Sequence, residues 1–162
     1  LEEAYLENLH TPLPCQYTNL CAVCQAQLRI MKVRYPKPGI VYKGAIPVAE
    51  IALNTSDKYL TILISALLGN AYKFTQEGTI SLECDRLGDD RVFVAVADTG
   101  CGIPPEKHGY VFERFTKLDP FSQGNGLGLY LCRLIVTHLH GEIYIDSGYT
   151  GGTRIVAILP RR

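Results

Sequence analysis

The sequence lacks an excess of charge of either sign, long apolar runs and a dense set of cysteines. Sixteen basic and sixteen acidic side chains cancel over 162 residues, so charge gives no reason to expect contact with nucleic acid or a membrane surface. No apolar run approaches the ~20 residues of a membrane span, and no secretory signal opens the chain. Six scattered cysteines favour the reduced cytosol over a disulfide scaffold. We therefore expect a cytoplasmic protein without direct membrane contact.

The length and the apolar content predict one globular domain with a short N-terminal appendage. An apolar content of 47% can fill a sizeable core, and a start at leucine rather than methionine suggests a piece of a longer protein. Asn19 precedes apolar residues at helical spacing, which predicts a helix that ends before the proline-rich "RYPKPG". We assign residues 1–38 to an N-terminal linker and helix, and residues 39–162 to the main domain.

Short strands and two helices are predicted in the main domain. Residues 40–54 suggest one or two strands, and residues 78–98 suggest two strands joined by a Gly-Asp-Asp turn. Between them, Ser56 or Asp57 caps a helix, whose predicted buried stripe is Leu60, Ile64, Leu67, Leu68, Ala71 and Phe74. The stretch "GLGLYLCRLIVTHLHG" predicts a second helix that ends at Gly141, and two strands follow it.

Asn70 and Lys73 form a first candidate pair. Positions 66, 70 and 73 share one helical face, so both side chains point to the same side. An amide oxygen can ligate Mg²⁺, and an ammonium group can meet a phosphate. A solvated helix face is the alternative interpretation of this pair.

The stretch "VADTGCGIP" brings Asp98 to the end of an apolar strand, beside Gly100 and Gly102. A partly shielded carboxylate suits an exocyclic amine such as that of adenine, and glycines let a flat ring approach the backbone. A plain Asx turn would use the same residues. An aspartic protease loop is disfavoured, because "ALLG" at 66–69, which would mimic the partner motif, lies inside a helical pattern.

Residues 100–126 are too long for an ordinary connection, and we expect a lid at about 102–125. In "VFERFTKLD", Phe112 and Phe115 would pin this lid and Lys117 would reach a terminal phosphate. A short surface helix with buried phenylalanines is the alternative.

The stretch "GNGLGL" opens the second helix and contains Gly124, Gly126 and Gly128. Backbone amides at a helix N-terminus make an anion site. A flexible hinge would use the same glycines.

The cysteines and the histidine near the N-terminus allow more than one interpretation. Cys21 and Cys24, with Cys15 and His10 nearby, could form a zinc knuckle, although their spacing on an apolar helix face favours buried thiols. We interpret His10 as an ordinary surface histidine.

Five stretches in this order resemble a known family. "LLGNAYKFTQEG", "VADTGCGIP", "VFERFTKLD", "GNGLGLYLCRLIV" and "GGTRIVAILP" are similar to the N, G1, F, G2 and G3 boxes of the ATP-binding catalytic domain of sensor histidine kinases, in the gyrase, Hsp90, histidine kinase and MutL superfamily. The resemblance covers residues 40–160. It implies an α+β, two-layer sandwich with a mixed, mostly antiparallel sheet and helices on one face, the Bergerat-type ATP-binding fold.

The resemblance also implies a role for each matching residue. Asn70 would bind Mg²⁺, Lys73 the phosphates and Asp98 the adenine amine. Gly100 and Gly102 would shape the base pocket, and Thr153 would support it. The remaining positions would face the phosphates: Gly124, Gly126, Gly128 and, as a lid cation, Lys117.

Two departures from the family pattern refine this prediction. Ala66 stands where relatives carry an asparagine, or a glutamate that acts as base for water, so hydrolysis of the gyrase type is disfavoured and Mg²⁺ binding weakened. In "ENLHTPLP", alignment of Thr11-Pro12-Leu13 with the phosphoacceptor motif places Glu7 where the histidine belongs. The chain thus resembles the phosphate donor of a kinase without its acceptor.

The implied function is transfer of the γ-phosphate of ATP to a histidine on a separate dimerisation domain, and then to the receiver domain of a response regulator. Intact glycines, Asn70 and Asp98 favour this reading. Ala66 favours the rival, a degenerate module that binds or senses nucleotide without phosphotransfer.

Overall fold

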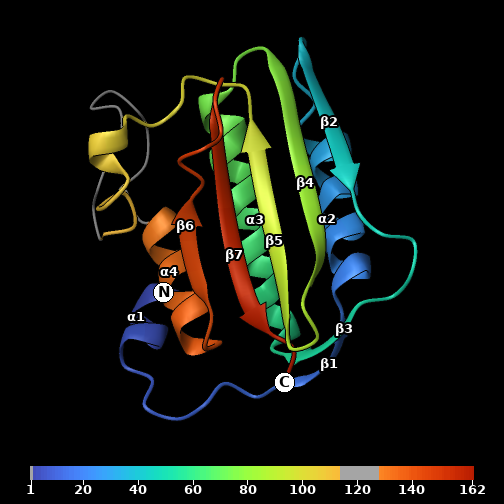
Figure 1. Cartoon of the computed structure of the whole chain (residues 1–162), viewed down its shortest axis with the longest axis vertical. Coiled ribbons are helices and arrows are strands. Elements are labelled where there is room, and N and C mark those ends of the chain that lie inside the picture. The colour runs from blue at the N-terminus through green and yellow to red at the C-terminus, as the bar shows by residue number, and fades with distance from the viewer. Residues whose placement is uncertain (1, 114–127) are drawn as a thin grey trace.

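The computed structural model describes residues 2–113 and 128–162. These residues form a layer of helices under one mixed sheet, with a separate two-stranded ribbon (Figure 1). The helices are α1 (Glu2–Glu7), α2 (Leu20–Arg34), α3 (Asp57–Phe74), α4 (Gly128–His138) and the short 3₁₀ turn η1 (Pro105–Lys107). The strands are β1 (Gln16–Asn19), β2 (Ile40–Ala45), β3 (Ala52–Thr55), β4 (Gly78–Leu87), β5 (Arg91–Asp98), β6 (Glu142–Ile145) and β7 (Thr153–Pro160).

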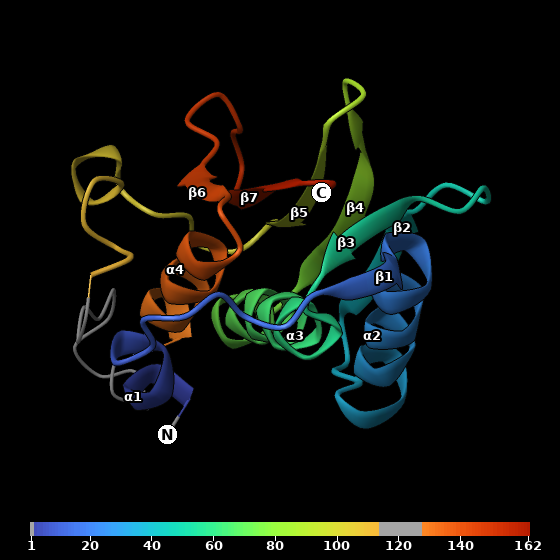
Figure 2. The ribbon, with the colours of Figure 1, turned by 90° about the horizontal axis from the view of Figure 1, so that it is seen from below.

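The main sheet has the order β2-β4-β5-β7-β6, and the ribbon pairs β1 with β3. β2 runs parallel to β4, while the other pairs of the main sheet are antiparallel. α2, α3 and α4 lie side by side against one face of the sheet (Figure 2). The predicted α+β sandwich with a mixed, mostly antiparallel sheet is therefore confirmed.

α3 is the central helix of the core. Ser56 caps it by accepting a hydrogen bond from the backbone N–H of Tyr59 at 3.3 Å, as one of the two predicted caps. The apolar side chains of its inner face are almost fully buried: Leu60, Leu63, Ile64, Leu67 and Leu68. The sequence prediction was wrong for Phe74, which is only half-buried, because the helix ends there and turns its ring toward Lys73.

The helical layer continues into the N-terminal residues. Asn19 caps α2 as predicted, by accepting from the N–H of Cys21. α2 packs against α3, β2 and β4, and its Leu20, Cys24 and Leu28 share the main core. A division between residues 38 and 39 therefore runs through one continuous core, because buried residues of α2 belong to the same apolar cluster as those of α3 and the sheet.

α1 is joined to this layer by polar contacts at both of its ends. The hydroxyl of Tyr59 donates to Glu2 at 2.7 Å, and that of Tyr130 donates to Glu7 at 2.7 Å. Leu6 is buried beside α4. Among the described helices, none combines the length and apolar character that a membrane crossing requires.

The thiols of Cys21 and Cys24 are buried, whereas Cys15 and His10 are exposed. Burial raises the pKa of Cys21 to about 11, so this thiol stays protonated at neutral pH. The predicted buried thiols are confirmed at these two positions.

α4 ends earlier than the sequence suggested. Its last residue is His138 rather than a position next to Gly141, and His140 adopts a left-handed backbone with φ of 63°. The N–H of Gly141 closes the end of the helix on the carbonyl of Val136 at 2.7 Å. A side chain at Gly141 would collide with the carbonyl of Ile158, so this glycine serves the packing of the chain against β7.

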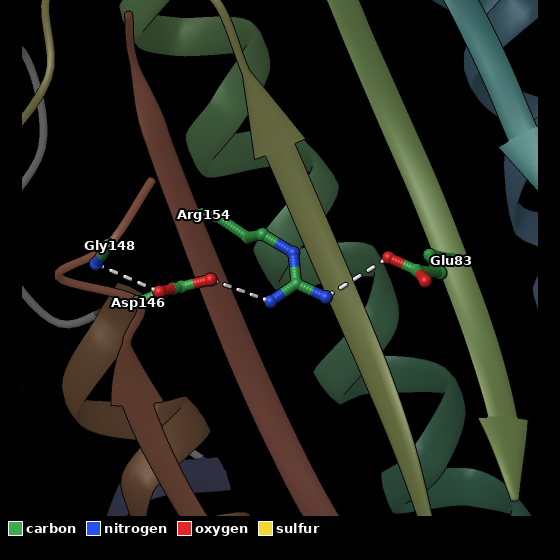
Figure 3. Close-up of polar contacts among 4 residues, drawn as sticks. All are labelled: Glu83, Asp146, Gly148 and Arg154. Atoms are coloured by element: carbon green, nitrogen blue, oxygen red, sulfur yellow. Dashed lines mark hydrogen bonds and ion pairs between the residues drawn. The ribbon is translucent and has the colours of Figure 1, made fainter. Parts of the chain in front are cut away.

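The guanidinium group of Arg154 crosses the face of the sheet opposite the helices (Figure 3). Arg154 on β7 donates to Asp146 at 2.9 Å and to Glu83 on β4 at 3.0 Å, passing over β5. Desolvation lowers the pKa of Arg154, but the two carboxylates outweigh it and raise the pKa overall. The side chain of Asp146 also accepts from the N–H of Gly148 at 3.0 Å. The network therefore fixes the loop between β6 and β7.

Candidate functional site

The ends of three elements meet at one end of the molecule. α3 finishes there with Phe74, β5 finishes with Asp98, and β7 begins with Thr153 (Figure 1). Asp98 pairs with Thr153 across the sheet, and Gly100 lies against the carbonyl of Phe74. The fold thus brings together residues that are more than 70 positions apart in the sequence.

Asp98 is a buried carboxylate with only 4% of its surface exposed. Its Oδ1 accepts from the N–H of Gly100 at 2.9 Å and from the N–H of Thr153 at 3.3 Å. Burial raises the pKa of the Asp98 carboxyl, and these two hydrogen bonds offset part of the rise. Within the described part of the chain no hydrogen bond reaches Oδ2, so this oxygen can accept from a ligand.

The hydrogen bond from the Gly100 N–H to Asp98 Oδ1 has the geometry of the Asx turn that was the alternative interpretation. Gly100 has no room for a side chain, because a Cβ would meet the Phe74 carbonyl and Asp98 Oδ1. Gly102 has a φ of +76° and lies next to the Gly152 carbonyl. The Asx turn is therefore present, and it is compatible with the predicted nucleotide site at Asp98.

The loop between β6 and β7 closes the other side of Asp98. The hydroxyl of Tyr149 donates to the carbonyl of Asp98 at 3.2 Å. Gly152 approaches so closely that a Cβ there would collide with the backbone of Asp98. The sequence analysis named Thr153, the first residue of β7, but missed Gly152 and Tyr149 in this loop. The two adjacent glycines of "GGTRIVAILP" could have pointed to Gly152. Nothing near Tyr149 in the sequence indicates its contact with Asp98.

Asn70 and Lys73 lie on the last turns of α3. Asn70 and Ala66 are half-buried and Lys73 is exposed, while Leu67, Leu68 and Ala71 face the core. The predicted separation of the helix into a core face and a polar face is therefore confirmed.

A magnesium ion fits this arrangement only as a partner of a phosphate ligand. Across residues 2–113 and 128–162, no three His, Cys, Asp or Glu side chains gather in a way that would hold a metal. One carboxamide oxygen, from Asn70, is a suitable but incomplete donor set for this hard cation. The other oxygens would come from phosphates and water, which is the usual mode for Mg²⁺ with a nucleotide.

Lys37 holds the end of α3, a contact that the sequence did not predict. Its ammonium group donates to the carbonyls of Tyr72 at 3.2 Å and Thr75 at 3.0 Å, and it lies 4.3 Å from the centre of the Tyr72 ring. A cation at a helix C-terminus satisfies carbonyls that lack helical partners and complements the helix dipole. Lys37 therefore anchors the turn of helix from which Asn70 and Lys73 project.

Replacing Lys37 with methionine is expected to lower the free energy of unfolding by about 1 kcal/mol, because two carbonyls lose a charged donor while the apolar stem is kept. Lys32→Met is the matched control, since Lys32 is exposed on α2. Urea denaturation of both variants measures the difference. Equal stability of Lys37→Met and the parent would contradict the anchoring role.

The described beginning of the predicted lid packs on the core. Phe112 is buried as predicted, together with Val111. Phe115, Lys117, Gly124 and Gly126 lie outside the described residues, so their predicted roles stay predictions. Gly128 is the exposed first residue of α4, and a Cβ there would meet no atom within 4 Å.

Comparison with known proteins adds family information. A family model described as histidine kinase-, DNA gyrase B- and HSP90-like ATPase matches residues 55–162. The adaptive-response sensory kinase SasA of Gloeothece citriformis is 31% identical over 159 residues, which cover 95% of this chain and 40% of that protein. The chain thus spans less than half the length of this curated relative.

Solved structures share the fold. Full-length ShkA, determined in complex with AMPPNP, matches 98% of this chain and 34% of its own, with a TM-score of 0.85 and 24% identity. A nucleotide-free catalytic domain of the histidine kinase ThkA matches 92% of this chain and 99% of its own, with a TM-score of 0.81 and 20% identity. The described residues of this chain therefore share the fold of these two structures.

Proposed function

The chain belongs to the family of histidine kinase-, DNA gyrase B- and HSP90-like ATPases, and we propose that it is the ATP-binding catalytic domain of a sensor histidine kinase that acts in the cytoplasm. The observation that carries the proposal is the buried Asp98, whose Oδ1 is held by two backbone N–H groups while Oδ2 is left to accept from a ligand. A carboxylate in this position selects a ligand that offers an N–H donor, as the amine of adenine does.

The base would lie against the glycines that surround Asp98. Gly100 and Gly102 leave the backbone uncovered, and the backbone N–H of Thr153 keeps the carboxylate in place. Glycine keeps the turn compact beside Asp98, because a side chain at Gly100 would collide with the carbonyl of Phe74.

The phosphates would extend from the base toward α3 and the start of α4. Lys73 would neutralise phosphate charge, and the backbone amides near Gly124, Gly126 and Gly128 would donate to phosphate oxygens. Lys117 would face the γ-phosphate from the lid. Asn70 would hold Mg²⁺, which when bound neutralises charge on the phosphate oxygens.

The reaction would be transfer of the γ-phosphoryl group to an imidazole nitrogen of a histidine on a separate dimerisation domain. The bond between the γ-phosphorus and the bridging oxygen breaks, ADP leaves, and a phosphorus–nitrogen bond forms. An aspartate of a response regulator receiver domain would then accept the group. The methyl of Ala66 cannot orient water, so the side chains in place favour transfer to a partner over hydrolysis.

Titration of the purified chain with ATP and ADP, with and without Mg²⁺, tests the proposal by calorimetry. We expect dissociation constants between micromolar and sub-millimolar, and tighter ATP binding with Mg²⁺. Addition of a dimeric histidine-acceptor domain should then give acid-labile phosphohistidine.

Two other outcomes would change the conclusion. Binding that Mg²⁺ does not affect, with no transfer, would support the degenerate sensing module, for which Ala66 is the specific observation. No binding of either nucleotide would overturn the assignment of Asp98 and the glycines to a nucleotide site.

A further inference from the structure

Thr75 directly follows α3 and is completely buried, with 0% of its surface exposed. Its backbone carbonyl accepts from Lys37, but its side-chain hydroxyl has no hydrogen-bond partner. Over residues 2–113 and 128–162, no other buried side-chain oxygen or nitrogen is without one. A buried hydroxyl without a partner is unfavourable, so its retention at this place calls for a physical reason.

The hydroxyl of Thr75 lies beside the turn at Gly100. A Cβ built on Gly100 would lie 3.0 Å from Thr75 Oγ1 and 3.1 Å from Asp98 Oδ1. The hydroxyl and the carboxylate thus approach Gly100 on the same side, where the carbonyl of Phe74 also lies, and the three groups leave no room for a side chain at this position.

The chemistry of the two groups is complementary. A carboxylate only accepts hydrogen bonds, while a hydroxyl can donate one. Oδ1 of Asp98 has one short hydrogen bond, from Gly100, and one long bond, from Thr153 at 3.3 Å. The bond from Thr153 is the longer and weaker of the two, so a hydroxyl donor can share or replace it at Oδ1.

We propose that Thr75 is a positioning residue for nucleotide recognition: when the base is bound, its hydroxyl donates to Asp98 Oδ1 and holds Oδ2 toward the amine of the base. This inference rests on the proposed function. The ligand class is a purine nucleotide with an exocyclic amine. A larger residue at position 100 would displace this turn, because its Cβ would collide with the carbonyl of Phe74.

The test compares Thr75→Val, which replaces the hydroxyl by a methyl group of similar size, with Thr75→Ser, which keeps the hydroxyl. Calorimetry would measure the affinity of each for ATP and for purine riboside triphosphate, which lacks the amine. Thermal unfolding without nucleotide would measure the stability of each variant. Thr75→Ala serves as a second hydroxyl-free variant should the valine variant not fold.

We expect Thr75→Val to bind ATP about tenfold more weakly, while its melting temperature without nucleotide is unchanged or higher, because an unpaired buried hydroxyl is removed. Thr75→Ser should bind ATP within about twofold of the parent, given that its donor is retained. For the analogue without the amine, the parent and Thr75→Val should have the same affinity.

Two results would overturn the inference and leave the proposed function in place. One is parental ATP affinity in Thr75→Val. The other is an equal loss for ATP and for the analogue, which would mean that the residue acts on the fold alone. If the parent itself binds no ATP, the proposed function fails together with this inference.

Discussion

Asp98→Asn is expected to weaken ATP binding by about 1 to 3 kcal/mol, roughly fivefold to 150-fold. The amide oxygen can still accept from Gly100 and Thr153, but the amide NH₂ would then replace Oδ2 and face the amine of the base. Two donors would meet, and neither would have an acceptor. Calorimetric titration with ATP measures the loss.

The same variant should leave the nucleotide-free chain as stable as the parent or more stable. Burial raises the pKa of Asp98, so the charged carboxylate is disfavoured in the fold relative to the unfolded chain. Asp89→Asn is the matched control, because Asp89 is exposed in the turn between β4 and β5. A marked drop in the melting temperature of Asp98→Asn, with proportional loss of binding, would mean that Asp98 serves the fold rather than a ligand.

The raised pKa of Asp98 also determines how binding responds to pH. Recognition of the amine needs the ionised carboxylate, so affinity is present above the pKa in the fold and is lost as the pH falls through it. The raised value places this loss at a higher pH than the ordinary 3.8 of an aspartate. The contribution of the group to stability has the opposite sign: it is fully present below the ordinary value and is lost as the pH rises through the raised one.

Gly152→Ala is expected to lower the free energy of unfolding by about 2 to 4 kcal/mol and to remove ATP binding. The added methyl would collide with the carbonyl of Asp98 and lie 2.9 Å from the Cα of Thr99. These are backbone atoms of a paired strand end, so they cannot turn aside as a flexible side chain would. The loop between β6 and β7 or the end of β5 would have to move, and either shift displaces Asp98.

Gly69→Ala is the control for this substitution. Gly69 is exposed in the interior of α3, and a Cβ there would meet no atom within 4 Å. The control should therefore gain about 0.5 to 1 kcal/mol, because alanine favours the helix over glycine. Denaturant unfolding of both variants gives the comparison, and equal effects of the two substitutions would contradict the close packing of Gly152 on Asp98.

Local sequence patterns were enough to predict the helices and strands and the polar side chains that each could contribute to a site. Apolar spacing and the cap at Ser56 predicted α3, and the strand ending at Asp98 was predicted together with its glycine turn. Such features depend on neighbours within a few residues, so they are readable from local patterns. The order of the five sequence motifs carried the family resemblance, and the resemblance implied the sandwich fold.

Which of these side chains contact each other, and which residues hold them in place, became clear from the tertiary structure alone. Lys37 contacts Tyr72, which lies 35 residues later, and Gly152 contacts Asp98, which lies 54 residues earlier. No local sequence pattern predicts either contact. The place of α2 in the core was also hidden, since an amphipathic helix does not specify the surface that it covers. Likewise, a threonine in a sequence carries no sign that its hydroxyl will be buried without a partner beside a carboxylate. The physical reason is that burial and hydrogen bonding across the sheet depend on side chains brought together by packing.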